Sequence, residues 1–248
     1  MNIDAPTQIE GKAVRLFVFD FDQTLSACHV FKALVGAGPL GLRRLRPPHT
    51  KTELGQVMRI FKSDQSGEFQ AEGGFAVAAF GGRDRVEKIR ALLEDLKAVG
   101  AVLVVCTRGL RGTVCKVLSD LDMLTYFSQV YGVPPNHYGS DLYEQTLNTN
   151  TVEPHVASFL SDNQGIFLHD KGRLAAQLLQ DWGLEKEHAV LIEDDSDEIN
   201  LAKPFCRTLW VREAKGIDEH HCRTLRAMAA GRGRFGSCCP GLFPLLHA

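Results

Sequence analysis

The segment Phe17-Val18-Phe19-Asp20-Phe21-Asp22-Gln23-Thr24-Leu25 places two aspartates at the end of an apolar run. Such a run is typical of a buried parallel strand, whose carboxyl end would carry the acids to one edge of a sheet. Because side chains alternate between the faces of a strand, Asp20 and Asp22 can share a site only if the chain leaves strand geometry there. Two neighbouring carboxylates repel each other unless a cation or a shared proton offsets their charge. The segment therefore predicts a functional site at the end of the first strand.

The composition limits the class of protein. The chain has 248 residues, 44% of them hydrophobic and 23% charged, with a formal net charge of −2. This length suits one α/β core with a modest additional segment, and the net charge argues against nucleic-acid binding. No apolar run approaches the roughly 20 residues of a membrane span, and residues 1–12 lack the apolar middle of a secretory signal. The seven cysteines form no Cys-x-x-Cys pair, which favours a reduced compartment, so we expect a cytoplasmic protein.

Strands alternate with helices along most of the chain. Apolar runs predict five strands, at residues 15–19, 101–106, 127–131, 188–192 and 207–211. Amphipathic stripes predict helices between them, of which the clearest begins at Asp84 and ends at Gly100, and a last helix at 218–229. This alternation predicts an α/β fold, a Rossmann-like parallel sheet with helices on both faces.

Two segments interrupt this alternation. Residues 27–82 contain two short helical patterns and many glycines, and we interpret them as a small helical cap inserted after the first strand. Residues 133–167 are rich in turn-forming residues and predict an irregular loop insertion with a short helix near 156–160. The expected catalytic core then comprises residues 12–26 and 83–215, and residues 216–248 form a C-terminal helix and tail.

Polar residues stand at the predicted strand ends and at the start of one helix. They are Asp20 and Asp22 after the first strand, Thr107 after the second, Asp194 and Asp195 after the fourth, and Lys171 at the start of the helix before the fourth. Because ligands of parallel sheets bind at the carboxyl ends of the strands, we expect these side chains to converge. Carboxylates with one hydroxyl and one ammonium suit a phosphoryl group and a hard cation, for which Mg²⁺ is the natural choice.

In order and context, these residues resemble the four motifs of the haloacid dehalogenase-like hydrolases, most of which are Mg²⁺-dependent phosphatases. The resemblance covers about residues 14–26 and 83–211 and omits the cap and the tail. It implies that Asp20 attacks phosphorus to form an aspartyl-phosphate, while Asp22 protonates the leaving oxygen and later activates water. It also implies that Thr107 binds the phosphoryl group and that Lys171 neutralises charge. A neighbouring carboxylate favours the protonated state that Asp22 needs as an acid.

The resemblance also implies a metal site. Asp20, the backbone carbonyl of Asp22 and Asp194 would bind Mg²⁺. Either Asp195 or Glu198 would act as an auxiliary acid, since Glu198 falls four residues after Asp194, where some relatives have a second aspartate.

The chain departs from the family pattern at two further positions. Glu193 stands where many relatives have glycine. Arg108 follows Thr107 where a small or amide residue is more usual, so it either reaches the substrate, together with Gly109, or pairs with the acidic cluster.

The expected activity is phosphomonoester hydrolysis on a small phosphorylated metabolite. An acid at the position of Asp22 favours dephosphorylation over dehalogenation, since a halide leaves without a proton. One alternative is a protein phosphatase acting on phosphopeptides, which shares the Asp-x-Asp-x-Thr pattern. Another is a non-catalytic interaction protein that retains the fold. The basic residues Arg43, Arg44 and Arg46 are either a solvated face or a rim that attracts anionic substrates.

Overall fold

The structure is a computed structural model that describes residues 12–40, 43–147, 154–160, 165–166 and 170–232. The tail beyond residue 232 and parts of the predicted 133–167 insertion lie outside these ranges. None of the described helices is long and apolar enough to cross a membrane.

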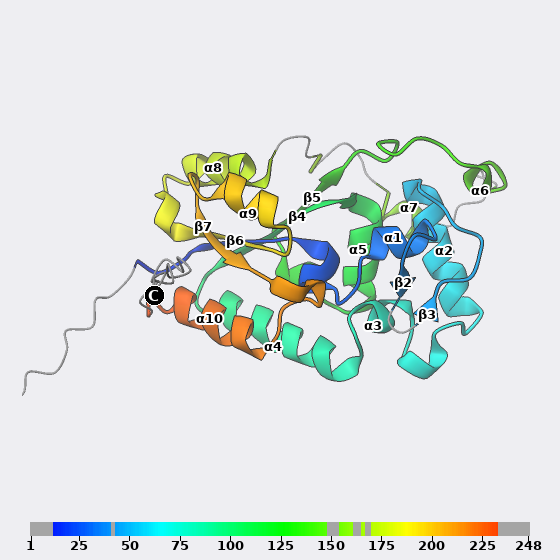
Figure 1. Ribbon diagram of the computed structural model, residues 1–248, viewed down its shortest axis with the longest axis horizontal. Helices are drawn as coiled ribbons and strands as arrows, with labels where there is room; N and C mark the ends of the chain where they lie inside the picture. Colours follow the sequence, from blue (N-terminus) through cyan, green and yellow to red (C-terminus); the bar gives the residue numbers. More distant parts are fainter. Residues whose placement is uncertain (1–11, 41–42, 148–153, 161–164, 167–169, 233–248) are drawn as a thin grey trace, which may run out of the picture.

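Five described strands form one sheet in the order β5-β4-β1-β6-β7, and all of its pairings are parallel (Figure 1). They are β1 (Leu16–Phe19), β4 (Val102–Leu110), β5 (Gln129–Val133), β6 (Ala189–Glu193) and β7 (Arg207–Trp210). The predicted strand after Gly100 was too short, because β4 continues to Leu110, with an irregular register after Cys106. Since β1 lies between β4 and β6, its carboxyl end lies where the strand order reverses, the usual position of a binding crevice.

Helices cover both faces of this sheet (Figure 1). One face is covered by α8 (Lys171–Asp181) and α9 (Ser196–Ala202), and the other by α4 (Arg83–Ala98), α5 (Arg111–Asp120) and α10 (Glu219–Ala229). Along β1, Phe17 and Phe19 pack in the core on the α4 side, whereas Leu16 and Val18 pack in the core on the α8 side. This alternation, with both faces buried, is expected for a central parallel strand. The predicted fold class is confirmed.

Residues 27–82, here the first inserted segment, connect η1 (Phe21–Leu25), which follows β1, to α4. They form α1 (Val30–Leu34), β2 (Pro39–Leu40), β3 (Arg43–Arg44), α2 (Glu53–Gln65), η2 (Gln70–Glu72) and α3 (Phe75–Ala79). The antiparallel pairing of β2 with β3 was not predicted. Helix α2 begins where Thr52 accepts a hydrogen bond from the backbone of Gly55, the cap expected of a threonine.

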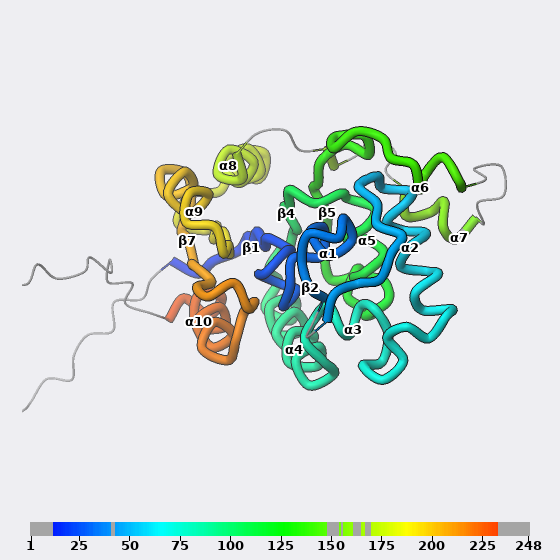
Figure 2. Tube along the Cα trace, turned by 45° about the vertical axis from the view of Figure 1, so that its right-hand side comes forward, coloured from blue at the N-terminus to red at the C-terminus, as the bar shows by residue number. Residues whose placement is uncertain are grey.

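Residues 133–167, here the second inserted segment, contain α6 (Leu142–Gln145) and α7 (Pro154–Ala157), so the predicted helix near 156–160 begins earlier. The remaining short helices are η3 (Leu124–Tyr126), η5 (Lys186–His188) and η6 (Arg212–Ala214). In both ribbon and tube views, helices α2, α6 and α7 of the two inserted segments lie together at one end of the molecule, on the outer side of α5 (Figures 1 and 2).

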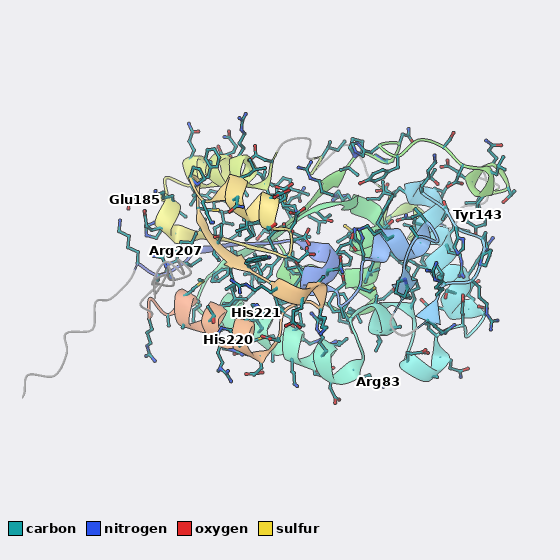
Figure 3. All side chains as sticks on the ribbon, in the orientation of Figure 1. Arg83, Tyr143, Glu185, Arg207, His220 and His221 are labelled. Carbon is teal, nitrogen blue, oxygen red and sulfur yellow. The ribbon has the colours of Figure 1, made fainter. Side chains whose placement is uncertain are left out.

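Hydrogen bonds join the inserted segments to each other and to the core. Asp141 accepts hydrogen bonds from the hydroxyl of Thr50, at 2.8 Å, and from the backbone N–H of Lys51, at 2.7 Å. The carboxylate of Glu53 accepts a hydrogen bond of 2.6 Å from the backbone N–H of Gly112, at the start of α5. Tyr143 lies at the outer end of this assembly (Figure 3), with the ammonium of Lys62 5.2 Å from its ring centre.

Candidate active site

The chain leaves strand geometry immediately after β1. Asp20 is extended, and Gln23 adopts a left-handed conformation with φ of 60°. The backbone N–H of Gln23 donates to the carbonyl of Cys28 at 3.1 Å, and its carbonyl accepts from the backbone N–H of Gly216 at 2.9 Å. The start of the first inserted segment and the chain before α10 therefore both hold the turn. Asp20 and Asp22 consequently line one recess of about 250 Å³. The turn required by the sequence pattern is present.

Lys171 lies at the centre of the buried charges. It begins α8, where the side chain of Asp170 caps the helix by accepting from the backbone of Arg173. Its ammonium lies 2.6 Å from Oδ1 of Asp20 and 2.5 Å from Oε2 of Glu193. Only 2% of the Lys171 side chain is exposed, and both carboxylates are buried as well.

Burial and mutual repulsion alter the protonation of these groups. Removal from water, together with the charges of Asp22 and Asp194, raises the pKa of Asp20 above its ordinary value, although Lys171 opposes the rise. Burial and the charge of Asp20 likewise raise the pKa of Glu193. Burial disfavours the charge of Lys171, but Asp20 and Glu193 outweigh this effect and raise the pKa of its ammonium. The recess therefore holds more negative charge than Lys171 alone compensates.

A divalent cation fits this arrangement. Carboxylate oxygens of Asp20, Glu193 and Asp194 all lie within 4.8 Å of one another, a spacing at which one ion could contact all three. Oxygen donors of this kind are the ligands that Mg²⁺ prefers. Burial raises the pKa of Asp194 as well, so a positive ion would stabilise the ionised forms of the cluster.

Glu193 is a site residue that the sequence reasoning did not assign. Its second oxygen, Oε1, accepts hydrogen bonds from the backbone N–H groups of Asp194, at 3.2 Å, and Asp195, at 3.1 Å. One carboxylate therefore contacts Lys171 and also supports the turn that carries Asp194. The sequence signal for its role was an acidic residue at the last position of a buried strand, directly before the Asp194-Asp195 pair.

The end of β4 forms one wall of the recess, through Thr107 and Arg108. Thr107 is buried, and its hydroxyl oxygen accepts a hydrogen bond of 2.8 Å from the backbone of Gly109, which leaves the hydroxyl hydrogen available to a ligand. Arg108 is half exposed and pairs with Glu198 at 2.6 Å. The structure thus has the pairing of Arg108 with the acidic cluster, one of the two possibilities that the sequence left open.

The two proposed auxiliary acids occupy different surroundings. Asp195 is exposed and caps α9 by accepting from the backbone of Asp197 at 2.7 Å. Glu198 is buried, and besides Arg108 it contacts the backbone N–H of Lys171 at 3.4 Å. Both line the recess, but among the described residues the cluster with metal-ligand spacing contains Glu193 in their place.

The first inserted segment also contributes to the recess, through His29 and Lys32, and neither residue was assigned from the sequence. His29 lies 3.1 Å from Asp22. The basic residues Arg43 and Arg46 line a separate depression with Pro47, Pro48 and Lys62, so they do not form the rim of this recess.

Comparison with known proteins gives matches among solved structures only. No protein-family model matches the chain, and no curated protein matches it.

Three of the matching structures are the following. A haloacid dehalogenase-like hydrolase from Streptococcus pneumoniae is 16% identical, with 86% of this chain and 90% of that one covered and a TM-score of 0.40. A predicted phosphatase from Clostridium acetobutylicum is 13% identical, with 86% and 91% covered and a TM-score of 0.41. The HAD domain of the effector protein Lem4 from Legionella pneumophila is 11% identical, with 88% and 95% covered and a TM-score of 0.47. By their names, the first and third of these structures are haloacid dehalogenase-like or HAD proteins, and the second is a predicted phosphatase.

Proposed function

We propose that the protein is a Mg²⁺-dependent phosphomonoester hydrolase that acts through an aspartyl-phosphate on Asp20. The observation that carries this proposal is the buried ion pair between Lys171 and Asp20, 2.6 Å long, at the carboxyl end of the central strand. A carboxylate is a weak nucleophile, and it becomes effective when it is fixed in position and relieved of charge repulsion by a neighbouring cation.

Each neighbouring residue has a role in this reaction. Asp20 forms a bond to phosphorus as the bond from phosphorus to the leaving oxygen breaks, and the electron pair remains on that oxygen. Asp22 gives its proton to the leaving oxygen and then takes a proton from the water that hydrolyses the aspartyl-phosphate. The hydroxyl of Thr107 donates a hydrogen bond to the transferring phosphoryl group, and Lys171 offsets its charge.

The metal would be held by Asp20, by Asp194 and by the backbone carbonyl of Asp22, with Glu193 close enough to join them. When bound, Mg²⁺ supplies electrostatic stabilisation to the phosphoryl oxygens. Asp195 and Glu198 support the site from α9, with Glu198 holding Arg108 at its edge.

We propose a small phosphorylated metabolite as the substrate, and the small size of the recess is compatible with that class. Its volume is about 250 Å³, below the range of roughly 300–1,000 Å³ that drug-sized ligands occupy. His29 and Lys32 bound it on the side of the first inserted segment. Beyond them, the ring of Tyr138, from the second inserted segment, lies 4.2 Å from that of Phe31, and its hydroxyl donates to the carbonyl of Arg108 at 2.6 Å.

The test is an assay of a generic aryl phosphate with and without Mg²⁺. We expect turnover that chelation abolishes and that Asp20→Asn lowers by at least about a thousand-fold. The exposed Asp197→Asn serves as the matched control and should retain activity. Turnover that survives Asp20→Asn or ignores chelation would refute the mechanism.

A substrate panel of phosphosugars, nucleotides, phospho-amino acids and phosphopeptides tests the substrate class. Highest kcat/KM on a small phosphomonoester supports the metabolite assignment, and activity confined to phosphopeptides overturns it. Absence of turnover on the whole panel, with intact folding, favours a non-catalytic protein.

A further inference from the structure

The carboxylate of Asp22 is held by the first inserted segment and not by the core strand that precedes it. Its Oδ1 accepts a hydrogen bond of 2.6 Å from the backbone N–H of Val30. Its Oδ2 lies 3.1 Å from Nδ1 of His29. Both contacts come from the start of α1, and the side chains of Asp22 and His29 are 11% and 28% exposed.

The second oxygen of Asp22, Oδ2, lies near the end of β4. A Cβ atom placed on Gly109 would be 3.7 Å from Oδ2 of Asp22 and 3.2 Å from Oγ1 of Thr107. Because Oδ1 already accepts from the backbone of Val30 at 2.6 Å, Oδ2 is the oxygen to which we assign the proton transfer.

The short distance to His29 has one chemical interpretation when Asp22 is ionised. A carboxylate only accepts hydrogen bonds, so a hydrogen bond across this distance requires Nδ1 of His29 to carry the hydrogen. In the other tautomer the same nitrogen accepts from the backbone N–H of Lys32, at 3.5 Å, which is at the limit of a hydrogen bond. The shorter distance to the carboxylate oxygen favours the tautomer with the hydrogen on Nδ1.

We propose that His29 is a positioning residue for the general acid. Together with the Val30 N–H it fixes both oxygens of Asp22, so the carboxyl group cannot rotate about its Cβ–Cγ bond away from the leaving oxygen. Each carboxylate oxygen has two acceptor positions, so Oδ2 keeps one for the transferred proton while it accepts from His29. This inference rests on the proposed function, in which Asp22 protonates the leaving group.

Loss of the contact between His29 and Asp22 should affect only the proton transfer to the leaving oxygen. If His29 is removed, Oδ1 remains bonded to Val30 but Oδ2 is free to leave the line of proton transfer. General acids typically contribute a factor of about 10²–10⁴, and a misplacement of about 1 Å can remove about a hundred-fold. The decrease in kcat/KM should appear with substrates whose leaving group needs a proton, and not with substrates whose leaving group departs as a stable anion.

The experiment compares kcat/KM for an alkyl phosphate and for nitrophenyl phosphate. This ratio reports the steps up to release of the leaving group, so hydrolysis of the aspartyl-phosphate does not affect it. The variants are His29→Asn, whose amide nitrogen occupies nearly the position of Nδ1, and His29→Gln and His29→Leu, which place no donor there. His220→Leu, an exposed histidine on α10 (Figure 3), is the matched control, and thermal melts verify that each variant folds.

We expect His29→Gln and His29→Leu to lower kcat/KM for the alkyl phosphate by about 10- to 100-fold and for nitrophenyl phosphate by less than about threefold. His29→Asn should restore most of the loss, and Asp22→Asn should give the same dependence on the leaving group, only larger. Equal losses on both substrates, no loss, or failure of His29→Asn to restore activity would overturn the inference. If Asp22→Asn itself shows no dependence on the leaving group, the acid role in the proposed function fails, and not merely the contribution of His29.

Discussion

Glu193 shows how a single buried residue can serve several groups of a site. One of its oxygens contacts Lys171, and the other accepts from the backbone of Asp194 and Asp195. A buried carboxylate is costly unless it is paired and hydrogen-bonded, and both conditions are met here. Its position therefore links Lys171, the cation beside the proposed nucleophile Asp20, to the turn that carries the proposed metal ligand Asp194.

Replacement of Glu193 by glutamine should weaken metal binding. Glu193→Gln removes the negative charge that Glu193 would carry beside a bound cation in the cluster with Asp20 and Asp194, and loss of a supporting carboxylate typically costs about 10- to 100-fold in metal affinity or activity. We expect the Mg²⁺ concentration for half-maximal activity to rise by that factor in a metal titration. The exposed Glu219→Gln is the control, and an unchanged titration for Glu193→Gln would contradict the assignment.

The ion pair between Arg59 and Glu68 in the first inserted segment should make stability depend on pH. Partial burial disfavours the charge of Glu68, but Arg59, 2.7 Å away, outweighs it and holds the pKa of Glu68 below its ordinary value of 4.5. A lowered pKa means that the contribution is fully present above pH 4.5 and is lost as the pH falls through the folded value.

Glu68→Gln should therefore lower the free energy of unfolding at pH 7 by about 1–3 kcal/mol, and this difference from the unmodified protein should shrink toward zero in strong acid. Denaturant unfolding at several pH values measures it. Glu72→Gln, at the more exposed pair with Arg43, should change stability by less than about 1 kcal/mol at any pH. A Glu68→Gln difference that stays constant with pH would refute the account.

Single-residue patterns predicted the acids at the end of β1 and not the contacts around them. Asp20 and Asp22 follow a buried apolar run, and that local signal is sufficient to place them at a sheet edge. The roles of Glu193 and His29 depend on Lys171 and on the return of the chain toward Asp22. Contacts made across a turn or between two elements leave no periodicity in the sequence.

At the scale of elements, the contact between α2 and α5 joins the first inserted segment to the core. Glu53 accepts from the backbone of Gly112, and the side chain of Gln56 accepts from the hydroxyl of Thr113 at 2.9 Å. The N–H groups at the start of a helix have no partner within it, and Glu53 supplies one to α5. The carboxylate also lies at the end of α5 that carries positive potential. Because α5 follows β4 directly, this contact supports the strand that carries Thr107.

Gly112→Ala tests how tightly this contact is packed. A Cβ atom at this position would lie 2.4 Å from the carbonyl oxygen of Phe159 and 2.7 Å from Cδ of Glu53, so α2 or the turn after α7 must move. Alanine in a helix is favoured over glycine by about 1 kcal/mol, yet we expect a net loss of about 1–3 kcal/mol, because overpacking dominates. Thermal unfolding measures the change, with Ser119→Ala in the same helix as the control. A stabilised Gly112→Ala protein would show that the contact is loose.

The strands of the sheet were predictable where burial on both faces produces continuous apolar runs, and their parallel arrangement was predicted from the alternation with helices. The association of the two inserted segments was not. It depends on Asp141, which both caps α6 and accepts from Thr50 and Lys51, and on the ring pair of Phe31 and Tyr138. These contacts join residues about a hundred positions apart, each ordinary in its own sequence context.

At the scale of the whole molecule, the core brings Asp20, Lys171 and the carboxylates of Glu193 and Asp194 to one edge of the sheet. We propose that these groups are the nucleophile, its cation and the metal ligands. The inserted segments bound that edge through His29, Lys32 and Tyr138. We therefore expect substitutions of these core residues to abolish the covalent reaction. Substitutions in the inserted segments should change the rate of the reaction and the preference for substrate.

The most direct test is to trap the covalent intermediate. The protein is mixed with a radiolabelled phosphomonoester and Mg²⁺, quenched in acid within milliseconds, digested, and the labelled peptide is sequenced by mass spectrometry. The account predicts an acid-stable, hydroxylamine-labile phosphoryl group on Asp20, absent from Asp20→Asn and without added Mg²⁺. A label on another residue, or full turnover with no labelled protein at any quench time, would contradict it.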